Sequence, residues 1–376
     1  MKLKLGGFVS LGGSNFVAGG ILGLFWIFLA DYLSKSDYGE LGYLMGIVNV
    51  AFVISLMGLG TTVSVFEPKK ENIFPAAFVL IIISSGIATI ITLIITQNIS
   101  ASILILGMSI YNIILTGLTS KKRYKDYAKW IIIRSVVAVT LSLVFFQILG
   151  INGILIGYFI SSLLILKDLK SLIQKRKVEF SKIRPKMKFM IHMWANRTSD
   201  VIFYWGDKIL IGAIFGFTML AEYQFAAQYM ILLSMIPRSV RQYLLPQESE
   251  GVQKKKLKKY AIIGVIMIAV LSVILVPFGI ENLLPKYNNS ILAIQIMSIS
   301  IIPLTITTIQ SVEFLAKANS RIVLVGSFLQ SGLYIILILV LGNYYGLEGF
   351  AIGFLVSLVI RVIYNNMYKA LITTKF

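Results

Sequence analysis

The chain has 376 residues, of which 57% are hydrophobic and 14% are charged, and its mean hydropathy is +0.85. Soluble domains are typically about 45–50% apolar and about 25% charged, so this composition indicates a membrane protein. There is no cysteine and only one histidine, which excludes disulfides, thiolate metal sites and multi-histidine zinc sites. We attribute the net charge of +19 to cytoplasmic loops and expect no nucleic-acid binding.

Apolar runs bounded by charged residues predict an all-α polytopic protein with about twelve membrane-spanning helices. Runs of 18 or more residues exceed the roughly 9–11 residues of a membrane β-strand. The first run continues through a whole span, so we interpret it as a helix rather than as a cleavable signal peptide. The predicted spans are residues 8–33, 39–64, 73–96, 99–120, 130–149, 151–168, 189–215, 218–245, 260–284, 290–316, 321–342 and 346–369.

The distribution of Lys and Arg predicts that both termini are cytoplasmic. Of 35 such residues, only Lys35 and Lys286 fall in the outer loops of this topology, and the alternation holds at every loop. Cytoplasmic loops of membrane proteins carry an excess of positive charge. We therefore expect a multi-pass protein of the cell membrane.

A glycine motif indicates an internal repeat. The pattern Gly-x-x-Gly-x-x-x-Gly-x-x-x-Ser begins at Gly150 and again at Gly346, at equivalent places in the predicted topology. Parallel repeats are a known transporter architecture, and small residues spaced four apart allow close helix contact. We expect two parallel six-helix halves, residues 1–168 and 189–376, joined by a basic cytoplasmic linker at 169–188.

The longest connection, Lys167–Lys188, leaves two interpretations open. Its apolar positions suit a basic amphipathic stretch lying on the anionic inner leaflet. A solvated linker between the two halves is the alternative. The apolar positions are Leu169, Leu172, Ile173, Val178, Phe180 and Ile183.

The predicted span 189–215 carries the most informative polar side chains. Ionisable groups inside a membrane are costly and usually face a cavity or a partner. At 100° per residue, six polar residues fall on one stripe. This stripe predicts the lining of a hydrated cavity, or ion pairs between the two halves. The six are Asn196, Arg197, Asp200, Tyr204, Asp207 and Lys208.

Four further arginines complete the candidate substrate cavity: Arg134, Arg238, Arg241 and Arg361. Arg238 and Arg241 are three residues apart beside a proline and could meet a phosphate, which arginine binds in a bidentate manner. Side chains that extend to the membrane surface are the alternative for Arg134 and for this pair.

Three acidic residues are candidates for a coupling ion: Asp200, Asp207 and Glu313. No phosphate-binding loop, dinucleotide motif, nucleophile elbow or zinc-protease motif occurs in the sequence. We therefore expect neither catalytic residues nor a metal or cofactor.

With these features the chain resembles the polysaccharide-exporter or O-antigen-type flippases. Their superfamily also holds the MATE-type multidrug exporters and the lipid II flippase. The resemblance rests on Leu29–Ser34 and Asp37–Gly39 near the first hairpin, on the two glycine turns, and on a stretch of the second half. In that stretch it rests on Asp207–Gly212, Gly216, Ala221–Tyr223, Ala226–Ala227, Ile236–Pro237 and Leu245–Pro246.

The resemblance implies a MATE-like fold and alternating access of the two halves. The implied cargo is a prenyl-diphosphate-linked glycan moved from the inner to the outer leaflet, its diphosphate held in a cationic cavity and its tail left among membrane lipids. Polysaccharide assembly enzymes are the implied protein partners.

Three other functions remain open from the sequence alone. A multidrug or small-molecule cation antiporter of the same fold would favour a carboxylate-rich cavity. A membrane polymerase or ligase would need a large external loop, which the predicted topology lacks. A scramblase or an assembly scaffold is the third.

Overall fold

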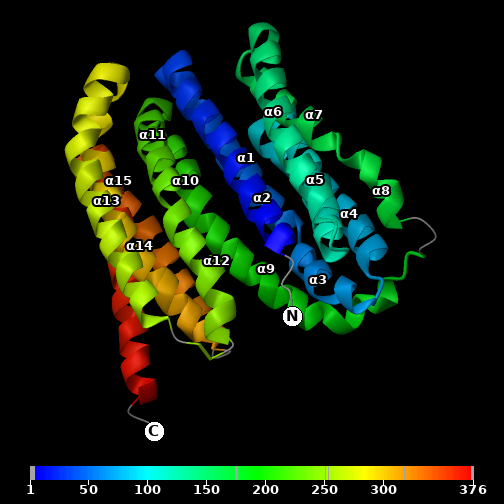
Figure 1. The fold of residues 1–376 in the computed structure, drawn as a ribbon. Helices are drawn as coiled ribbons and strands as arrows, with labels where there is room; N and C mark the ends of the chain where they lie inside the picture. Colours follow the sequence, from blue (N-terminus) through cyan, green and yellow to red (C-terminus); the bar gives the residue numbers. More distant parts are fainter. Residues whose placement is uncertain (1–4, 174–176, 250, 253, 317–318, 374–376) are drawn as a thin grey trace. The chain divides into compact units, whose positions relative to one another are not determined.

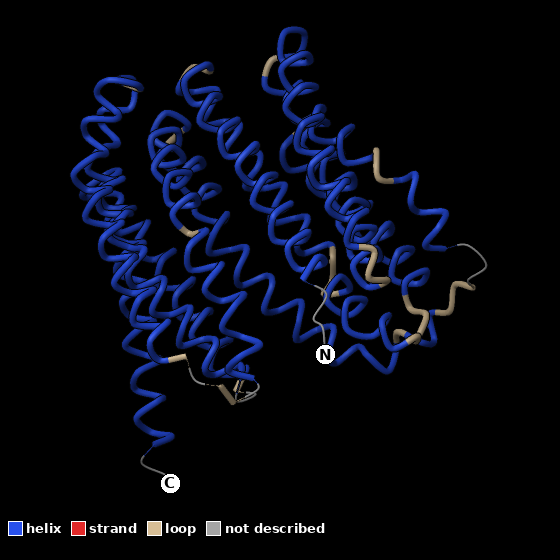
Figure 2. The backbone as a smooth tube through the Cα atoms, viewed as in Figure 1, coloured by secondary structure: helices blue, strands red, loops and turns tan. Residues whose placement is uncertain are grey.

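The computed structural model describes residues 5–173, 177–249, 251–252, 254–316 and 319–373. Across these ranges the regular structure is helical and no strand occurs, as the tube in Figure 2 shows. Contacts divide the chain into two compact units. Unit 1 holds the described residues up to Trp26 and Leu44–Val201, and unit 2 holds Ile27–Tyr43 and the described residues from Ile202 onward.

The first helices alternate with tight breaks (Figure 1). Both α1 and α2 are divided between the two units, with the end of α1 and the start of α2 in unit 2. Gly58, in the left-handed conformation (φ 72°), separates α2 from α3. The Glu67 carboxylate accepts hydrogen bonds from the backbone N–H groups of Ile73 and Phe74 and so caps the start of α4. The elements are α1 (Leu5–Tyr32), α2 (Lys35–Ser55), α3 (Leu59–Phe66), η1 (Glu67–Lys69), α4 (Phe74–Thr96) and α5 (Ile99–Ser120).

The remaining helices of unit 1 surround an apolar core. The core joins α3, α4, α5, α6 and α8, and Leu59, Phe74, Ile113 and Leu172 are among its fully buried members. These helices are α6 (Tyr124–Leu149), α7 (Ile151–Leu163), α8 (Leu166–Ile173), the short η2 (Phe180–Lys182) and η3 (Arg184–Lys186), and α9 (Met187–Val201).

Unit 2 contains the rest of the chain together with the end of α1 and the start of α2. The second part of unit 2 begins with a π-helical turn at Ile202–Gly206, labelled η4, which leads directly into α10. The others are α10 (Asp207–Phe215), α11 (Phe217–Leu233), α12 (Met235–Ser249), α13 (Lys255–Leu283), η5 (Pro285–Ser290), α14 (Ile291–Ala316) and α15 (Ser320–Thr373).

The two glycine turns have the same local geometry. Gly150 (φ 58°, ψ −138°) separates α6 from α7, and Gly346 (φ 54°, ψ −127°) breaks α15. A Cβ at Gly153 would collide with the backbone of Phe145, and a Cβ at Gly349 would collide with that of Leu341. Glycine is therefore required for the same close helix contact in each unit.

Within the part of the chain that the structure describes, nine helices are long and apolar enough to cross a membrane. The protein is thus an all-helical, multi-pass membrane protein. The predicted spans 189–215 and 218–245 differ from the expectation of single long helices. The first consists of α9, the π-helical turn and α10, and the second of α11 and α12.

Candidate functional site

The predicted polar stripe is not one continuous helical face. The π-helical turn at Ile202–Gly206 follows i→i+5 hydrogen bonding, so the 100° spacing used to place the stripe does not hold through it. The unit boundary falls at the same place: Arg197 and Asp200 belong to unit 1, whereas Asp207 and Lys208 belong to unit 2. The stripe therefore divides into two groups with different surroundings.

In unit 1, Arg197 lines a cavity of about 410 Å³. The cavity lies among the end of α2, α3, α5 and α9. Arg197 is exposed, and no described residue forms a hydrogen bond or ion pair with it. The other lining residues are Phe52, Val53, Leu56, Gly58, Gly60, Thr61, Ser64, Asn112 and Thr116.

Packing of α9 on the break between α2 and α3 places Arg197. Trp194, one turn earlier on α9, donates its Nε1–H to the carbonyl oxygen of Ile54 at 3.0 Å. At Gly58 a Cβ would collide with the backbone of Met190 and would lie 2.9 Å from the backbone nitrogen of Trp194. The left-handed glycine therefore ends α2 and also lets α9 approach, which brings Arg197 to the cavity.

Uncharged polar residues of this cavity escaped the sequence analysis. Asn112 and Thr116 lie one turn apart on α5, and Thr61 and Ser64 lie on α3. A Ser or Thr inside an apolar span commonly bonds to its own helix backbone, as Thr116 does to the carbonyl of Asn112 at 2.8 Å. The sequence signal that could have found them is their turn-by-turn spacing on neighbouring predicted spans.

In unit 2, Asp207 and Lys208 form a buried charged cluster with two tyrosines. Their exposed fractions are only 3% and 2%, and Lys208 Nζ lies 3.2 Å from Asp207 Oδ1. Lys208 Nζ also donates to the carbonyl oxygen of Tyr204 at 2.8 Å. Tyr223 donates its hydroxyl to Asp207 Oδ2, and the hydroxyls of Tyr223 and Tyr334 lie 2.7 Å apart.

This cluster joins α10, α11 and α15 through side chains that all have partners. Adjacent residues on a helix do not face each other, but the long Lys208 side chain turns back toward the preceding π-helical turn and reaches both acceptors. A small cavity of about 30 Å³ adjoins it, lined in part by Phe203, Tyr204 and Phe354. Asp207 is therefore neutralised by a tethered ammonium within its own unit.

The other candidate residues lie in varied places. In α9, Asn196 donates its side-chain amide to the carbonyl of His192. The guanidinium of Arg134 lies 4.6 Å from the ring centroid of Tyr111 and donates to Ser162 Oγ at 3.0 Å. Arg361 donates to Gln330 Oε1 at 2.6 Å. Arg238 and Arg241 are exposed on α12.

Glu313 is held by two lysines. Its carboxylate accepts from Lys258 Nζ at 2.6 Å and from Lys369 Nζ at 2.8 Å. Lys258 is also paired with Glu248 at 2.9 Å. The structure thus shows a network of ion pairs at Glu313, and the assignment of this residue to ion coupling stays a prediction.

The two predicted outer lysines both hold the hairpin between α1 and α2 within unit 2. Lys286 Nζ donates to the carbonyl oxygens of Ala30 at 3.0 Å, of Asp31 at 3.2 Å and of Leu33. These carbonyls lie at the C-terminal end of α1, where a cation is favourable. Lys35 pairs with the carboxylate of Glu222.

We expect that Lys286→Ala loosens this hairpin, because three carbonyl oxygens lose a charged donor. Hydrogen bonds to charged groups contribute roughly 1.5–3 kcal/mol each, so amide exchange in Ile27–Tyr43 should accelerate by about tenfold or more. Hydrogen-exchange mass spectrometry of the purified protein measures this. Lys125→Ala, which removes an exposed lysine of α6, serves as the control, and equal exchange in both variants would contradict the prediction.

Comparisons with known proteins show the family and the fold of the chain. A family model described as "polysaccharide biosynthesis protein" matches residues 28–285. Because the match covers more than half of the chain, the chain belongs to the polysaccharide biosynthesis protein family. No match is found among curated protein sequences.

Three solved structures share the fold. The lipid II flippase MurJ in an inward closed conformation has a TM-score of 0.72 and 16% identity, covering 95% of this chain and 86% of its own. An inward-facing multidrug resistance MATE family transporter of the MOP superfamily has a TM-score of 0.66 and 15% identity, covering 96% of each chain.

The third is a MOP superfamily transporter from Pyrococcus furiosus Vc1 (DSM3638), described as having a binding pocket of reverse polarity. It has a TM-score of 0.56 and 13% identity, covering 97% of this chain and 95% of its own. At these identities the three structures establish a common fold.

Proposed function

We propose that the protein is a flippase that moves a lipid-diphosphate-linked oligosaccharide from the cytoplasmic to the outer leaflet by alternating access. The observation that carries this proposal is the unit 1 cavity, in which the guanidinium of Arg197 has no partner among the described residues and is accompanied by side-chain hydroxyls and an amide. Arginine binds phosphate oxygens in a bidentate manner. Hydroxyl and amide groups are suited to the sugar that follows.

The proposed topology has twelve spans in two parallel six-helix halves, with both termini inside. Two observations support it. Counting Ser320–Thr373 as two spans, and α9–α10 and α11–α12 as one span each, brings the nine candidate helices to twelve. The same glycine turn and close helix contact recur in each unit. The halves are residues 1–168 and 189–376, joined by 169–188.

A cation antiporter of the same fold is the alternative that the cavity disfavours. The described lining of the unit 1 cavity includes a guanidinium and no carboxylate. In unit 2 the buried Asp207 is already neutralised by Lys208. An organic cation entering the unit 1 cavity would meet a like charge.

Reconstitution of the purified protein in liposomes tests the proposal. Vesicles carry a fluorescent prenyl-diphosphate oligosaccharide, and the fraction that becomes accessible on the opposite leaflet is measured. We expect transfer above that of protein-free vesicles, and weaker transfer of a prenyl-linked glycan without the diphosphate. Uptake of a fluorescent organic cation against a proton or sodium gradient, without glycolipid transfer by folded protein, would favour the antiporter.

A further inference from the structure

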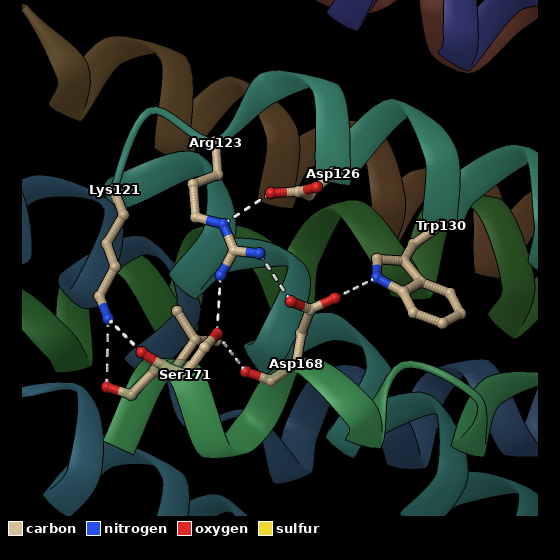
Figure 3. A network of polar contacts seen from close by, with 7 residues as sticks. Lys121, Arg123, Asp126, Trp130, Asp168 and Ser171 are labelled. Carbon is tan, nitrogen blue, oxygen red and sulfur yellow. Dashed lines mark hydrogen bonds and ion pairs between the residues drawn. The ribbon is translucent and has the colours of Figure 1, made fainter. Parts of the chain in front are cut away.

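The helix that follows α7 is fixed to unit 1 by the polar network in Figure 3. Arg123, which precedes α6, donates to Asp126 at 2.6 Å, to Asp168 at 2.7 Å and to Ser171 Oγ at 2.7 Å. Trp130 donates its indole N–H to the other oxygen of Asp168. Asp168 and Ser171 belong to α8, so these bonds hold α8 against the loop between α5 and α6.

Lys121 and apolar packing complete the attachment. Lys121 Nζ donates to the carbonyl oxygens of Ser171 at 3.1 Å and of Leu172 at 3.3 Å (Figure 3), which suits the C-terminal end of a helix. Leu172 is fully buried in the core of unit 1. One face of α8 is therefore held against unit 1 by hydrogen bonds and apolar packing, so this helix is not a freely solvated linker.

The guanidinium of Arg123 keeps its positive charge. Burial lowers the pKa of the Arg123 guanidinium, but its hydrogen bonds and charge interactions with Asp126 and Asp168 outweigh this and leave the pKa above its ordinary value. The carboxylate of Asp168 is thus paired with Arg123 and also accepts a hydrogen bond from Trp130. It is not available to neutralise the lysines beside it on α8.

The residues from α8 to the start of α9 expose cations that have no partner among the described residues: Lys167, Lys170, Lys177, Arg184 and Lys188. In contrast, Lys182 pairs with Glu179 at 3.0 Å, and Lys186 pairs with Glu71.

Exposed apolar side chains alternate with these cations. Leu166, Val178, Phe180 and Met187 are each 40–49% exposed. A solvated linker gains nothing from such side chains, whereas a surface that combines cations with exposed apolar groups matches the boundary between the headgroups and acyl chains of an anionic bilayer.

We propose that residues 166–173 and 177–188 form a docking surface for anionic phospholipids of the cytoplasmic leaflet. The cations pair with lipid phosphates, and the exposed apolar side chains enter the upper acyl region. The assignment to the cytoplasmic leaflet rests on the orientation given under the proposed function. The preference for anionic phospholipids rests on the cations and exposed apolar side chains of the surface itself. Docking would fix the cytoplasmic end of unit 1 at the membrane surface.

The test uses the full-length protein with Val178→Cys as its only cysteine, because the natural chain has none. The cysteine carries an environment-sensitive fluorophore, and the protein is placed in nanodiscs of phosphatidylcholine alone or with increasing phosphatidylglycerol. We expect a blue shift and quenching by spin-labelled lipid that grow with phosphatidylglycerol and weaken at high salt.

Charge reversal sharpens the test. In the same background, Lys167→Glu, Lys170→Glu and Arg184→Glu together should raise the phosphatidylglycerol content needed for half of the shift by on the order of tenfold. The matched control is Lys254→Glu, Lys255→Glu and Lys256→Glu, which makes the same change of charge at the start of α13 and should leave the shift in place.

Two results would overturn the proposal. One is a fluorophore that is equally solvated in neutral and anionic nanodiscs, which would identify a solvated linker. The other is a shift that appears only when an added acidic protein is present. The fluorescence requires no transport, so failure of lipid docking and failure of the flippase proposal are separate outcomes.

Discussion

Replacing Arg197 by alanine is expected to reduce translocation of the prenyl-diphosphate oligosaccharide by roughly 10- to 100-fold. A hydrogen bond to a charged group contributes roughly 1.5–3 kcal/mol, and about 1.4 kcal/mol corresponds to a factor of ten. Arg197 is the cation that lines the described part of the unit 1 cavity. Initial rates in the liposome assay measure the effect.

Two companion variants separate a bound phosphate from a general effect of charge. Arg197→Lys keeps the charge but loses the planar fork, so an intermediate rate is expected. Arg321→Ala removes an exposed guanidinium at the start of α15 that lies outside the candidate cavity, and it should keep the native rate. Native rates for Arg197→Ala, with transport by the unmodified chain, would contradict the site and leave the function standing.

Arg241→Ala tests the other part of the candidate cavity. Its side chain is exposed on α12, so loss of activity would indicate that α12 also meets the cargo. An unchanged rate would support the alternative that this arginine extends to the membrane surface.

Hydropathy and charge were sufficient to predict the all-helical, multi-pass fold, whereas the family was predicted from a resemblance carried by particular residues, among them Leu29–Ser34, Asp37–Gly39 and Asp207–Gly212. Long apolar runs leave few alternatives to a helix in lipid. The glycine motif at Gly150 and Gly346 also predicted where two helices meet closely, because only a residue without Cβ fits beside Phe145 or Leu341. These are properties of local sequence, which hydropathy and residue size describe well.

The surroundings of the charged residues were less accessible from sequence. A helical wheel assumes a constant rotation per residue along the helix. Nothing in the composition predicted the π-helical turn before Asp207, where this assumption does not hold. The partners of Glu313 are Lys258 and Lys369, which are distant in sequence, and helix packing alone decides that they meet. Asn112 became notable only when α5 was placed beside α3.

The buried pair in unit 2 is expected to produce the largest loss of stability. Asp207→Ala would leave Lys208, only 2% exposed, without its carboxylate in an almost fully buried site. Removing one partner of a buried ion pair costs roughly 3–5 kcal/mol, whereas replacing both partners by apolar residues is often close to neutral. We therefore expect Asp207→Ala to lower the apparent Tm by several degrees and Asp207→Leu with Lys208→Met to recover most of the loss.

Thermal unfolding of the purified protein in detergent measures both variants, at one heating rate because unfolding of membrane proteins is commonly irreversible. Glu313→Ala is the matched control: Lys258 keeps Glu248 at 2.9 Å, and the Lys369 side chain is 57% exposed. It should cost less, because Lys258 keeps a second carboxylate and the pair with the exposed Lys369 contributes only about 0–1 kcal/mol. If the single and double variants at 207 and 208 were equally destabilised, the loss would come from the hydrogen bond between Tyr223 and Asp207 rather than from the unpaired ammonium.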